Sequence, residues 1–261
     1  MGRKKIVINN RLADNETFVS FVNSLSDIFS KQGDTLYDAR NVIKSYDLDT
    51  DDSTLSRVVA KRFRKPNFIQ RIVYTFFRKS KAERAFHNGA RLLERGISTP
   101  ENLAYVETYQ NHLLAYGYYV TGVDGAPPIR DLLLTPKEFD RPLADAFAMF
   151  VARLHEKGIL HNDLNSTNVL YHQQDDGTYT FSVIDINRMK FYPLGETPTL
   201  YECMDNMTRY CGDMLLFEYV ARRYAKCRQL DVESTVKKMI AVKNRHDEQY
   251  RRRKSFFKLF K

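Results

Sequence analysis

The chain has 261 residues, a hydrophobic fraction of 43% and a formal net charge of +9 at pH 7. This length suits one bilobal unit or two small domains, and the ordinary hydrophobic share leads us to expect a sizeable core. No apolar run approaches the roughly 20 residues that cross a bilayer, and the N-terminus lacks the apolar segment of a secretory signal. The three cysteines show no metal-ligand spacing, which favours a reducing compartment. We therefore expect a cytoplasmic protein, or one peripheral to a membrane.

The positive charge is concentrated in two segments. Residues 61–81 carry eight cations and no acid, and the tail at 251–261 interleaves cations with aromatic side chains. Such clusters attract phosphates, nucleic acid or anionic lipid. The middle segment is either a polyanion-binding surface or a solvated basic face. The tail either lies in a membrane interface or is a disordered basic end.

The N-terminal half predicts a small antiparallel sheet with helices. Apolar residues at helical spacing predict a helix over 15–31. A second helix is expected over 80–95, because Ser80 suits its N-cap, Glu83 completes a capping box and Gly96 ends the helical pattern. Five strands are expected at 35–37, 41–46, 55–63, 102–109 and 112–123.

Helices dominate the C-terminal half. The expected elements are a linker at 121–125, helices over 143–157, 200–228 and 232–253, and a loop over 191–202. A sheet with one helix, followed by mainly helices, indicates an α+β, bilobal fold. We expect an N-lobe over 1–122, with an N-terminal helical extension, and a mainly helical C-lobe over 123–261.

Residues 160–170 and the strand after them carry the strongest functional signal. The stretch is His-x-Asp-Leu-x-x-x-Asn, followed by a hairpin with Asp-Gly at its turn and an apolar strand that ends at Asp185. This order is typical of a phosphotransferase catalytic loop and its metal-binding strand. Transfer of the ATP γ-phosphoryl group needs a carboxylate near the acceptor hydroxyl and oxygen ligands for Mg²⁺. Asp163 is the candidate catalytic residue, and Asn168 and Asp185 are the candidate metal ligands. The alternative is a hairpin whose Asp and Asn side chains only cap turns.

Further candidates for binding ATP come from the N-terminal half. Val58-Val59-Ala60-Lys61 resembles the Val-Ala-x-Lys strand of kinases with one residue missing, and Lys61 is the candidate that holds the α- and β-phosphates. Glu83 either orients this lysine or only caps its helix. There is no G-x-G-x-x-G phosphate loop, so Arg40 and Asn41 are the candidates in its place. Backbone groups from Gly122 to Asp124 are expected to contact adenine.

At the catalytic stretch the sequence resembles the lipopolysaccharide kinase family, which phosphorylates Kdo or heptose in the inner core of lipopolysaccharide. Matching segments are Arg-Asn-Val-Ile-Lys at 40–44, Val-Ala-Lys-Arg-Phe at 59–63, Ser-Lys-Ala-Glu-Arg at 80–84 and Leu-Leu-Glu-Arg-Gly-Ile-Ser-Thr-Pro at 92–100. The resemblance covers about 35–190. It implies a protein-kinase-like fold that uses ATP and Mg²⁺, with Asp163 catalytic, Asn168 and Asp185 on the metal and Lys61 on the phosphates.

Three departures from protein kinases bear on the substrate. Asn162 replaces the arginine before the catalytic aspartate, Asn165 replaces the lysine two positions after it, and Ile186-Asn187 replaces Phe-Gly after Asp185. These changes favour a small-molecule or glycan hydroxyl over a protein substrate. The expected partners are a glycolipid, Kdo-lipid A or core lipopolysaccharide, and the inner face of the cytoplasmic membrane.

Other functions stay open at this point. An atypical protein kinase and an inactive pseudokinase scaffold both fit the same motifs, although the intact Lys61, Asp163, Asn168 and Asp185 disfavour the scaffold. Nucleic-acid binding through the basic tail would show a steep salt dependence. No nucleic-acid-binding motif is present, so no nucleic-acid partner is expected.

Overall fold

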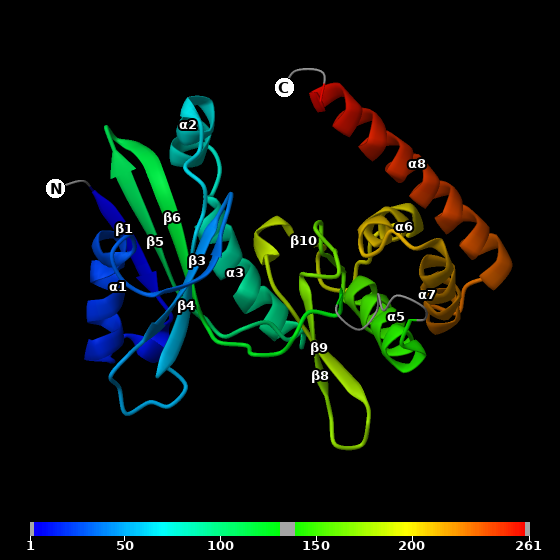
Figure 1. Cartoon of the computed structure of the whole chain (residues 1–261), viewed down its shortest axis with the longest axis horizontal. Helices are drawn as coiled ribbons and strands as arrows, with labels where there is room; N and C mark the ends of the chain where they lie inside the picture. Colours follow the sequence, from blue (N-terminus) through cyan, green and yellow to red (C-terminus); the bar gives the residue numbers. More distant parts are fainter. Residues whose placement is uncertain (1–2, 131–138, 259–261) are drawn as a thin grey trace. The chain divides into compact units, whose positions relative to one another are not determined.

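The computed structural model describes residues 3–130 and 139–258, with side chains as far as Ser255 (Figure 1). The aromatic end of the tail, 256–261, therefore lies outside the described side chains, as does part of the segment that follows the predicted linker. The chain divides into two compact units. The first contains the chain up to Gly125 together with Asp185–Asn187, and the second contains Ala126–Ile184 and the chain from Arg188 onward. Each has a hydrophobic core of its own.

The first unit is built on a six-stranded antiparallel sheet. Its strands, in spatial order, are β1 (Lys4–Ile8), β5 (Asn102–Gln110), β6 (Leu113–Gly122), β4 (Arg57–Arg62), β3 (Val42–Asp47) and β2 (Asp34–Asp38). The five strands expected from the sequence are confirmed. The sixth, β1, was not expected. It pairs with β5, with Lys4 opposite Thr108 and Ile8 opposite Ala104, and so covers an edge that five strands would leave open.

Helices cover both faces of this sheet. After a short 3₁₀ turn, η1 (Asn10–Leu12), α1 (Glu16–Ile28) packs Phe18, Val22 and Leu25 into a core with alternate residues of the strands, among them Ala60 and Ala104. The prediction of this helix is confirmed. α3 (Lys81–Glu94) lies on the other face, where the Phe86 and Tyr105 rings are 5.3 Å apart. Because side chains alternate along a strand, Lys61 lies on the face that α3 covers.

A helix that the sequence did not predict lies between β4 and α3. α2 (Phe68–Phe76) begins with a capping box, in which Asn67 and Gln70 each bond the backbone N–H of the other. It lies beside β6 (Figure 1). The Asn-x-x-Gln pattern was the signal for this helix. Its β-branched and aromatic residues, which favour strands over helices, obscured it.

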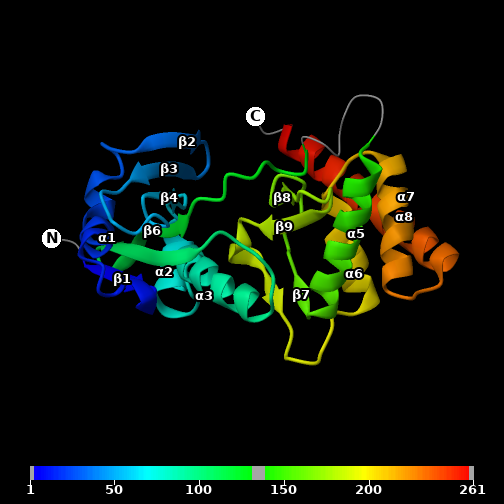
Figure 2. The same cartoon turned by 90° about the horizontal axis from the view of Figure 1, so that it is seen from below.

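Helices form most of the second unit. α5 (Arg141–Glu156), α7 (Met214–Cys227) and α8 (Val232–Lys258) pack in sequence, α5 on α7 and α7 on α8 (Figure 2). The single helix expected over 200–228 is wrong, because the chain forms α6 (Leu200–Asn206), the 3₁₀ turn η3 (Met207–Arg209) and then α7. Asp213 accepts the N–H of Leu216 at 2.8 Å and starts α7 anew. The break turns Tyr210 inward, where its ring stacks on Phe217 with 5.8 Å between centroids.

Short strands carry the catalytic stretch. β7 (Ile159–Leu160) pairs with β10 (Lys190–Phe191), and β8 (Val169–Gln173) pairs with β9 (Tyr179–Val183) in the hairpin that the sequence predicted. A 3₁₀ turn, η2 (Ile186–Arg188), follows β9. The α+β prediction is confirmed by the antiparallel sheet of the first unit and the helices of the second. Within the described part of the chain, no helix combines the length and the apolar character that a membrane span requires.

Candidate active site

His161 fixes the start of the catalytic loop, residues 161–168. Its side chain is 1% exposed. Its Nδ1 accepts the backbone N–H of Asp163 at 3.2 Å, and its Nε2 lies 2.9 Å from the carbonyl oxygen of Ile184. A neutral ring with its proton on Nε2 satisfies both contacts. The ring therefore ties the catalytic loop to the residue that precedes Asp185.

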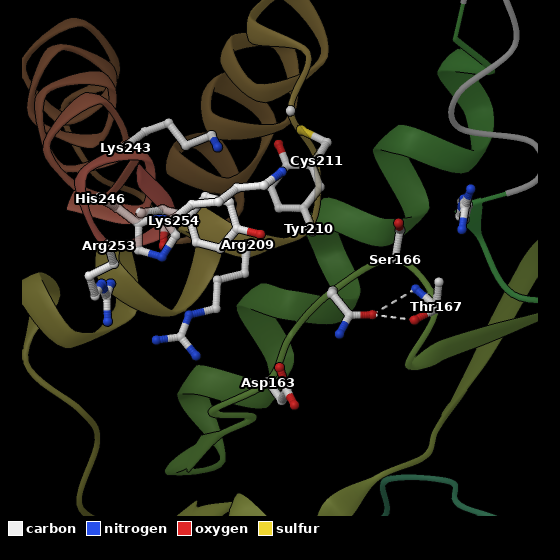
Figure 3. Close-up of a pocket in the computed structure, with 15 residues that line it drawn as sticks. Asp163, Ser166, Thr167, Arg209, Tyr210, Cys211, Lys243, His246, Arg253 and Lys254 are labelled. Atoms are coloured by element: carbon white, nitrogen blue, oxygen red, sulfur yellow. Dashed lines mark hydrogen bonds between the residues drawn. The ribbon is translucent and has the colours of Figure 1, made fainter. Parts of the chain in front are cut away.

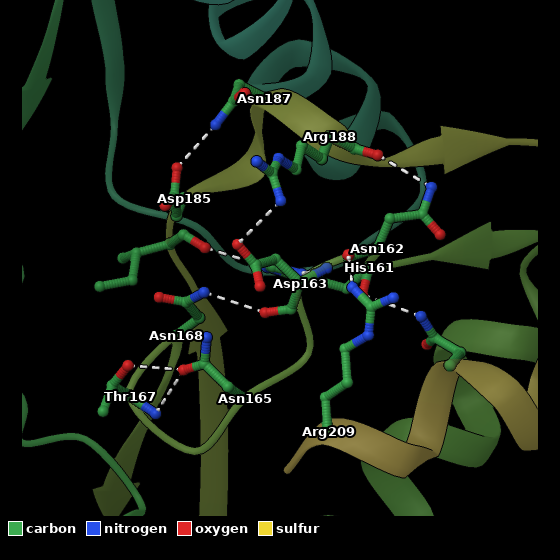
Figure 4. Close-up of polar contacts among 12 residues, drawn as sticks. His161, Asn162, Asp163, Asn165, Thr167, Asn168, Asp185, Asn187, Arg188 and Arg209 are labelled. Atoms are coloured by element: carbon green, nitrogen blue, oxygen red, sulfur yellow. Dashed lines mark hydrogen bonds and ion pairs between the residues drawn. The ribbon is translucent and has the colours of Figure 1, made fainter. Parts of the chain in front are cut away.

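Asp163 is held through its backbone, which leaves its carboxylate toward solvent. Its carbonyl oxygen accepts the N–H of Asn165 at 2.8 Å and Nδ2 of Asn168 at 2.9 Å (Figure 4). The carboxylate lies 3.7 Å from Nη1 of Arg188, and the side chain is 31% exposed. The loop thus presents an accessible carboxylate with a guanidinium beside it.

Asn168 is the buried end of the loop. Because its Nδ2 donates to the Asp163 carbonyl, its side-chain oxygen is the atom left for a ligand, and it accepts no hydrogen bond from the residues that the structure describes. The Asn168 carbonyl accepts the N–H of Ile184 at 3.0 Å, one step beyond the Val169–Val183 pair of the hairpin. Asp185 follows Ile184 directly, so the hairpin register accounts for the spacing between the two candidate metal ligands.

Asp185 is fixed by residues of the first unit. Its Oδ1 lies 2.8 Å from Nζ of Lys61 and accepts Nδ2 of Asn187 at 2.6 Å. Its φ of 56° lies in the left-handed region, where aspartate is tolerated better than most side chains. Asn88 of α3 donates to the carbonyl oxygen of Ile186 at 2.8 Å. The structure therefore brings Lys61 and Asp185 together and anchors the turn after Asp185 on α3.

Glu83 is not in contact with Lys61. Its carboxylate lies 3.4 Å from Nζ of Lys5 and 3.7 Å from Nε2 of His87. Burial lowers the pKa of His87, so at neutral pH the Lys5 contact is an ion pair and the His87 contact is not. The backbone N–H of Glu83 donates to Oγ of Ser80 at 3.1 Å, so the predicted N-cap is confirmed.

The remaining nucleotide-binding candidates lie at two places in the first unit. Arg40 is exposed in the turn between β2 and β3. Beside it, Oδ1 of Asn41 accepts the N–H of Arg64 at 3.1 Å, which joins that turn to the end of β4. Gly122 ends β6 and donates its N–H to the carbonyl of Glu101 at 2.9 Å. Asp124 follows and is half-buried. The N–H of Gly122 is thus already engaged by Glu101.

A buried hydrogen-bonded chain supports the catalytic loop from below. Asn206 donates from Nδ2 to the carbonyl of His161 at 2.8 Å, and its Oδ1 lies 3.1 Å from Nε2 of His155. Nδ1 of His155 lies 2.8 Å from the hydroxyl of Tyr224. Burial lowers the pKa of His155 to about 4, so the ring is neutral at pH 7. The backbone at His161 therefore rests on side chains from α5, α6 and α7.

A pocket of about 1110 Å³ opens beside the catalytic loop, within the second unit. Asp163, Ser166 and Thr167 line one side, and Lys243, His246, Arg253 and Lys254 of α8 line the other (Figure 3). Among the lining residues that the structure describes, Asp163 is the only acid. The basic residues are Arg130, Arg209, Lys243, His246, Arg253 and Lys254. The candidate catalytic carboxylate therefore borders a large, basic pocket.

Two of these cations have fixed positions. Lys243 is 3% exposed at its side chain and pairs with Asp247 at 2.8 Å, so its charge is neutralised locally. Arg209 donates from Nη1 to the carbonyl of Asn162 at 2.8 Å, next to Asp163. Arg253 and Lys254 lie exposed on α8. The pocket thus offers charge both beside Asp163 and farther along α8.

Comparison with known proteins decides the family. Residues 31–192 match the lipopolysaccharide kinase (Kdo/WaaP) family. This match spans strands β2 to β6 of the first unit, the catalytic loop and Asp185. The chain belongs to the lipopolysaccharide kinase family. It is accordingly a kinase, a phosphotransferase of lipopolysaccharide biosynthesis. No curated protein matches the sequence.

Two solved structures are similar to this chain, to different degrees. WaaP, in a structure titled as a complex with acyl carrier protein, superposes with a TM-score of 0.58 at 16% identity, over 94% of this chain and 98% of that one. The Rio2 kinase of Chaetomium thermophilum, titled as an ADP/Mg²⁺-phosphoaspartate complex, gives a TM-score of 0.44 at 17% identity, over 84% of this chain and 75% of that one. The kinase-like fold expected from the sequence is confirmed by the WaaP superposition.

Several residues around this kinase's motifs were not identified from the sequence. Asn88, Asn187, Arg188 and Arg209 all bond to the catalytic loop or to the turn after Asp185. Asn187 and Arg188 stand directly after the Asp185 motif, so position was a signal. Asn88 bonds Ile186, which is 98 positions away in the sequence, and Arg209 bonds Asn162, which is 47 positions away. No local sequence pattern reveals hydrogen bonds over such separations.

Proposed function

We propose that this lipopolysaccharide kinase transfers the γ-phosphoryl group of ATP to a sugar hydroxyl, of Kdo or heptose, in the inner core. The observation that carries the proposal is the position of Asp163 at a pocket whose other charged lining residues, among those described, are basic. Inner-core glycolipids are polyanions, and a basic pocket raises their local concentration. The site of action in this proposal is the cytoplasmic face of the inner membrane.

Asp163 acts on the acceptor in this proposal. Its carboxylate orients the sugar hydroxyl and accepts its proton as the oxygen–phosphorus bond forms. The bond between the γ-phosphorus and the β,γ-bridging oxygen breaks, and ADP leaves. His161 and Asn168 hold the backbone of Asp163, so little reorganisation is required during the reaction. Arg188, at 3.7 Å from the carboxylate, adds positive charge near the transferred group.

Asn168 and Asp185 are the residues that would hold Mg²⁺. A carboxylate and an amide oxygen are the hard oxygen ligands that this ion prefers, and Mg²⁺ commonly takes one or two protein ligands together with substrate phosphates. Bound there, the ion neutralises charge on the β- and γ-phosphates. The Asn168 amide is already turned so that its nitrogen faces the Asp163 carbonyl and its oxygen is left for a ligand.

The nucleotide is the proposed ligand of the first unit. Lys61 binds the α- and β-phosphates when Asp185 turns to the metal, and Glu83 becomes its acidic partner in exchange for Lys5. Arg40 and Asn41 contact phosphates from the turn between β2 and β3. Backbone groups from Gly122 to Asp124 contact adenine, with the Gly122 carbonyl as acceptor because its N–H already bonds Glu101.

The test is a direct assay of phosphate transfer. The purified protein is incubated with ATP, Mg²⁺ and either Kdo-lipid A or a heptosylated core acceptor, and the glycolipid is examined by mass spectrometry for one added phosphate. Asp163→Ala is expected to lose this product while it still binds ATP. Turnover of Asp163→Ala at the wild-type rate would refute the assignment. Added phosphate found on protein and not on the glycolipid would indicate a protein kinase. Transfer of phosphate to no acceptor at all would indicate a pseudokinase.

A further inference from the structure

α2 carries its apolar side chains on the outside of the first unit. Ile69, Ile72, Val73 and Phe76 recur at the spacing of one helical face. Ile69 is 72% exposed and Phe76 is 66% exposed, and Phe68 and Phe77 at the helix ends are 66% and 81% exposed. Ile72 and Val73, between Ile69 and Phe76 on this face, are half-buried, and none of the nine residues of α2 is fully buried. A surface helix of a globular protein normally turns such a face inward.

The polar face of α2 is hydrogen-bonded to the rest of the first unit. Arg71 donates from Nε to the carbonyl of Leu114 at 2.8 Å and from Nη2 to the carbonyl of Gln110 at 2.7 Å. Oγ1 of Thr75 accepts the N–H of Leu114 at 2.9 Å. These bonds fix the rotation of α2 about its axis on the hairpin between β5 and β6. The outward direction of the apolar stripe is therefore imposed by the fold.

Exposed cations stand at both ends of this stripe. Arg64 and Lys65 precede the N-cap of α2, and Arg78 and Lys79 follow its last turn. All four are exposed, and the sequence contains no acid from 61 to 81. The surface is thus an apolar strip between two positive ends. We call the strip of Phe68, Ile69, Ile72, Val73, Phe76 and Phe77, together with these four cations, the α2 surface.

We propose that the α2 surface docks on an anionic phospholipid membrane, with α2 parallel to it. An amphipathic helix of this kind places its apolar face at the boundary of headgroups and acyl chains, while lysine and arginine reach the headgroup phosphates. Each cation near an anionic surface adds to the attraction. A lipid surface fits better than a folded acidic partner, because phenylalanine side chains stand exposed along one side of a helix that is only nine residues long. The docking is independent of phosphate transfer, so either proposal can fail alone.

The first test measures binding of the full-length protein to vesicles. Wild type is sedimented with vesicles of phosphatidylglycerol and phosphatidylethanolamine, or with vesicles of phosphatidylcholine alone. The double variant Ile69→Ser/Phe76→Ser is expected to lower the partition coefficient on anionic vesicles at least about tenfold, since each side chain loses its apolar burial. Arg64→Gln/Arg78→Gln is expected to lower it similarly and to flatten its salt dependence. Leu93→Ser/Leu215→Ser removes two exposed apolar side chains elsewhere and should change nothing.

The second test reports insertion directly. The chain contains no tryptophan, so Phe76→Trp introduces a unique fluorophore on the stripe. On anionic vesicles its emission is expected to shift to shorter wavelength, and lipids with brominated acyl chains are expected to quench it. Leu215→Trp, at an exposed position of α7, serves as the matched fluorophore and should show neither effect. Because Phe76 is exposed, either substitution leaves the core intact, and circular dichroism checks this.

The outcomes separate the proposals. Loss of vesicle binding in the α2 variants, with quenching of the tryptophan at position 76, supports α2 docking even if no phosphate transfer is found. Wild-type vesicle binding by both α2 variants would overturn the proposal and place docking elsewhere. An unquenched tryptophan at 76 on vesicles that do bind the protein would also overturn it. Absence of vesicle binding by wild type, with binding of an acidic protein through α2, would replace the membrane with a protein partner.

Discussion

Nζ of Lys61 lies 2.8 Å from Oδ1 of Asp185, although the two residues are 124 positions apart. The side chains are 15% and 27% exposed, so the ion pair is shielded from water to a large degree. Asn187 donates to the same carboxylate oxygen. Asp185 thus has a left-handed backbone conformation, and its Oδ1 is contacted by two donors. One of these donors is the ammonium group of Lys61, so the carboxylate faces a positive charge. This pairing supports the proposal that Lys61 and Asp185 act on one group, the phosphates and their metal.

Lys61→Met is expected to lower kcat/KM for ATP about 100- to 1000-fold, the usual cost of one charged donor at a phosphoryl site. Asp185→Asn is expected to raise the Mg²⁺ concentration for half-maximal activity. Because the two residues share an ion pair, the double variant should lose less than the product of the single losses. The measurement is steady-state kinetics with ATP and Mg²⁺ varied independently. Lys44→Met, on the neighbouring strand, is the matched control and should leave both dependences unchanged. Fully multiplicative losses would show that Lys61 and Asp185 act separately.

The two asparagines of the catalytic loop should behave differently. Asn168 donates to the Asp163 carbonyl and keeps its oxygen for a ligand, whereas Asn165 accepts the N–H of Thr167 at 2.9 Å and shapes a turn. Asn168→Ala is expected to raise the Mg²⁺ concentration needed for half-maximal activity. It is also expected to cost about 0.5–1.5 kcal/mol of stability, because the Asp163 carbonyl loses one of its two donors. Asn165→Ala should affect stability alone. Titration of activity with Mg²⁺, beside thermal unfolding, separates the two.

Asn168→Asp sharpens this prediction. The aspartate retains an oxygen ligand for the metal but cannot donate to the Asp163 carbonyl. Its Mg²⁺ requirement should therefore stay near that of the wild type while its stability falls. A variant Asn168→Asp with wild-type stability and no metal response would remove Asn168 from the metal site.

The sequence predicted those parts of the site that depend on short spacings. His161 to Asn168, the Asp-Gly turn and Asp185 form one continuous loop and hairpin, so their order specifies their register. Lys61 was identified because its strand carries a motif. The interaction of Lys61 with Asp185 instead of Glu83 was not predicted, because it depends on how α3 lies over the sheet. Lys5, on the unexpected strand β1, lies 3.4 Å from the Glu83 carboxylate.

Two errors in the fold have different physical origins. β1 becomes a strand through pairing with β5, about a hundred residues later, and α6 and α7 separate because a capping aspartate competes with helix continuation. The pairing of β1 is not visible in local sequence, whereas the cap at Asp213 is a local signal that the apolar pattern of residues 200–228 outweighed in the prediction. The break between α6 and α7 also contributes to the candidate site, because Thr208 to Gly212 line the basic pocket. Only the structure shows that a loop between helices, a catalytic loop and α8 enclose one space.

Stability should depend on pH through His155. Burial holds its folded-state pKa at about 4, against 6.5 for an ordinary histidine. Between these values the unfolded chain binds a proton that the folded chain does not, so the free energy of unfolding falls as pH decreases, by about 3 kcal/mol in total. Urea unfolding from pH 7 to pH 4 measures this slope. His155→Gln, which can still bond Asn206 and Tyr224 but cannot titrate, should flatten it, whereas His112→Asn at an exposed turn should not.

Recognition of the acceptor can be tested with two neighbouring arginines of α8. Arg253 lines the basic pocket, and Arg252 lies outside it and pairs with Glu248 on the helix surface. Arg253→Gln is expected to raise KM for the glycolipid about 10- to 100-fold with little change in kcat, since a charge-assisted hydrogen bond is worth about 1.5–3 kcal/mol. Arg252→Gln should leave KM unchanged. Kinetics at varied acceptor concentration and saturating ATP make the comparison.

A modified acceptor shows whether Arg253 recognises charge. If the guanidinium of Arg253 contacts a phosphate or carboxylate of the acceptor, removal of that anionic group should raise KM for the wild type and abolish the further effect of Arg253→Gln. If Arg253→Gln raises KM equally for charged and uncharged acceptors, the arginine contributes only shape or packing. The charge on the acceptor then meets another cation of the pocket, and Arg209, held 2.8 Å from the Asn162 carbonyl next to Asp163, is the residue to substitute next.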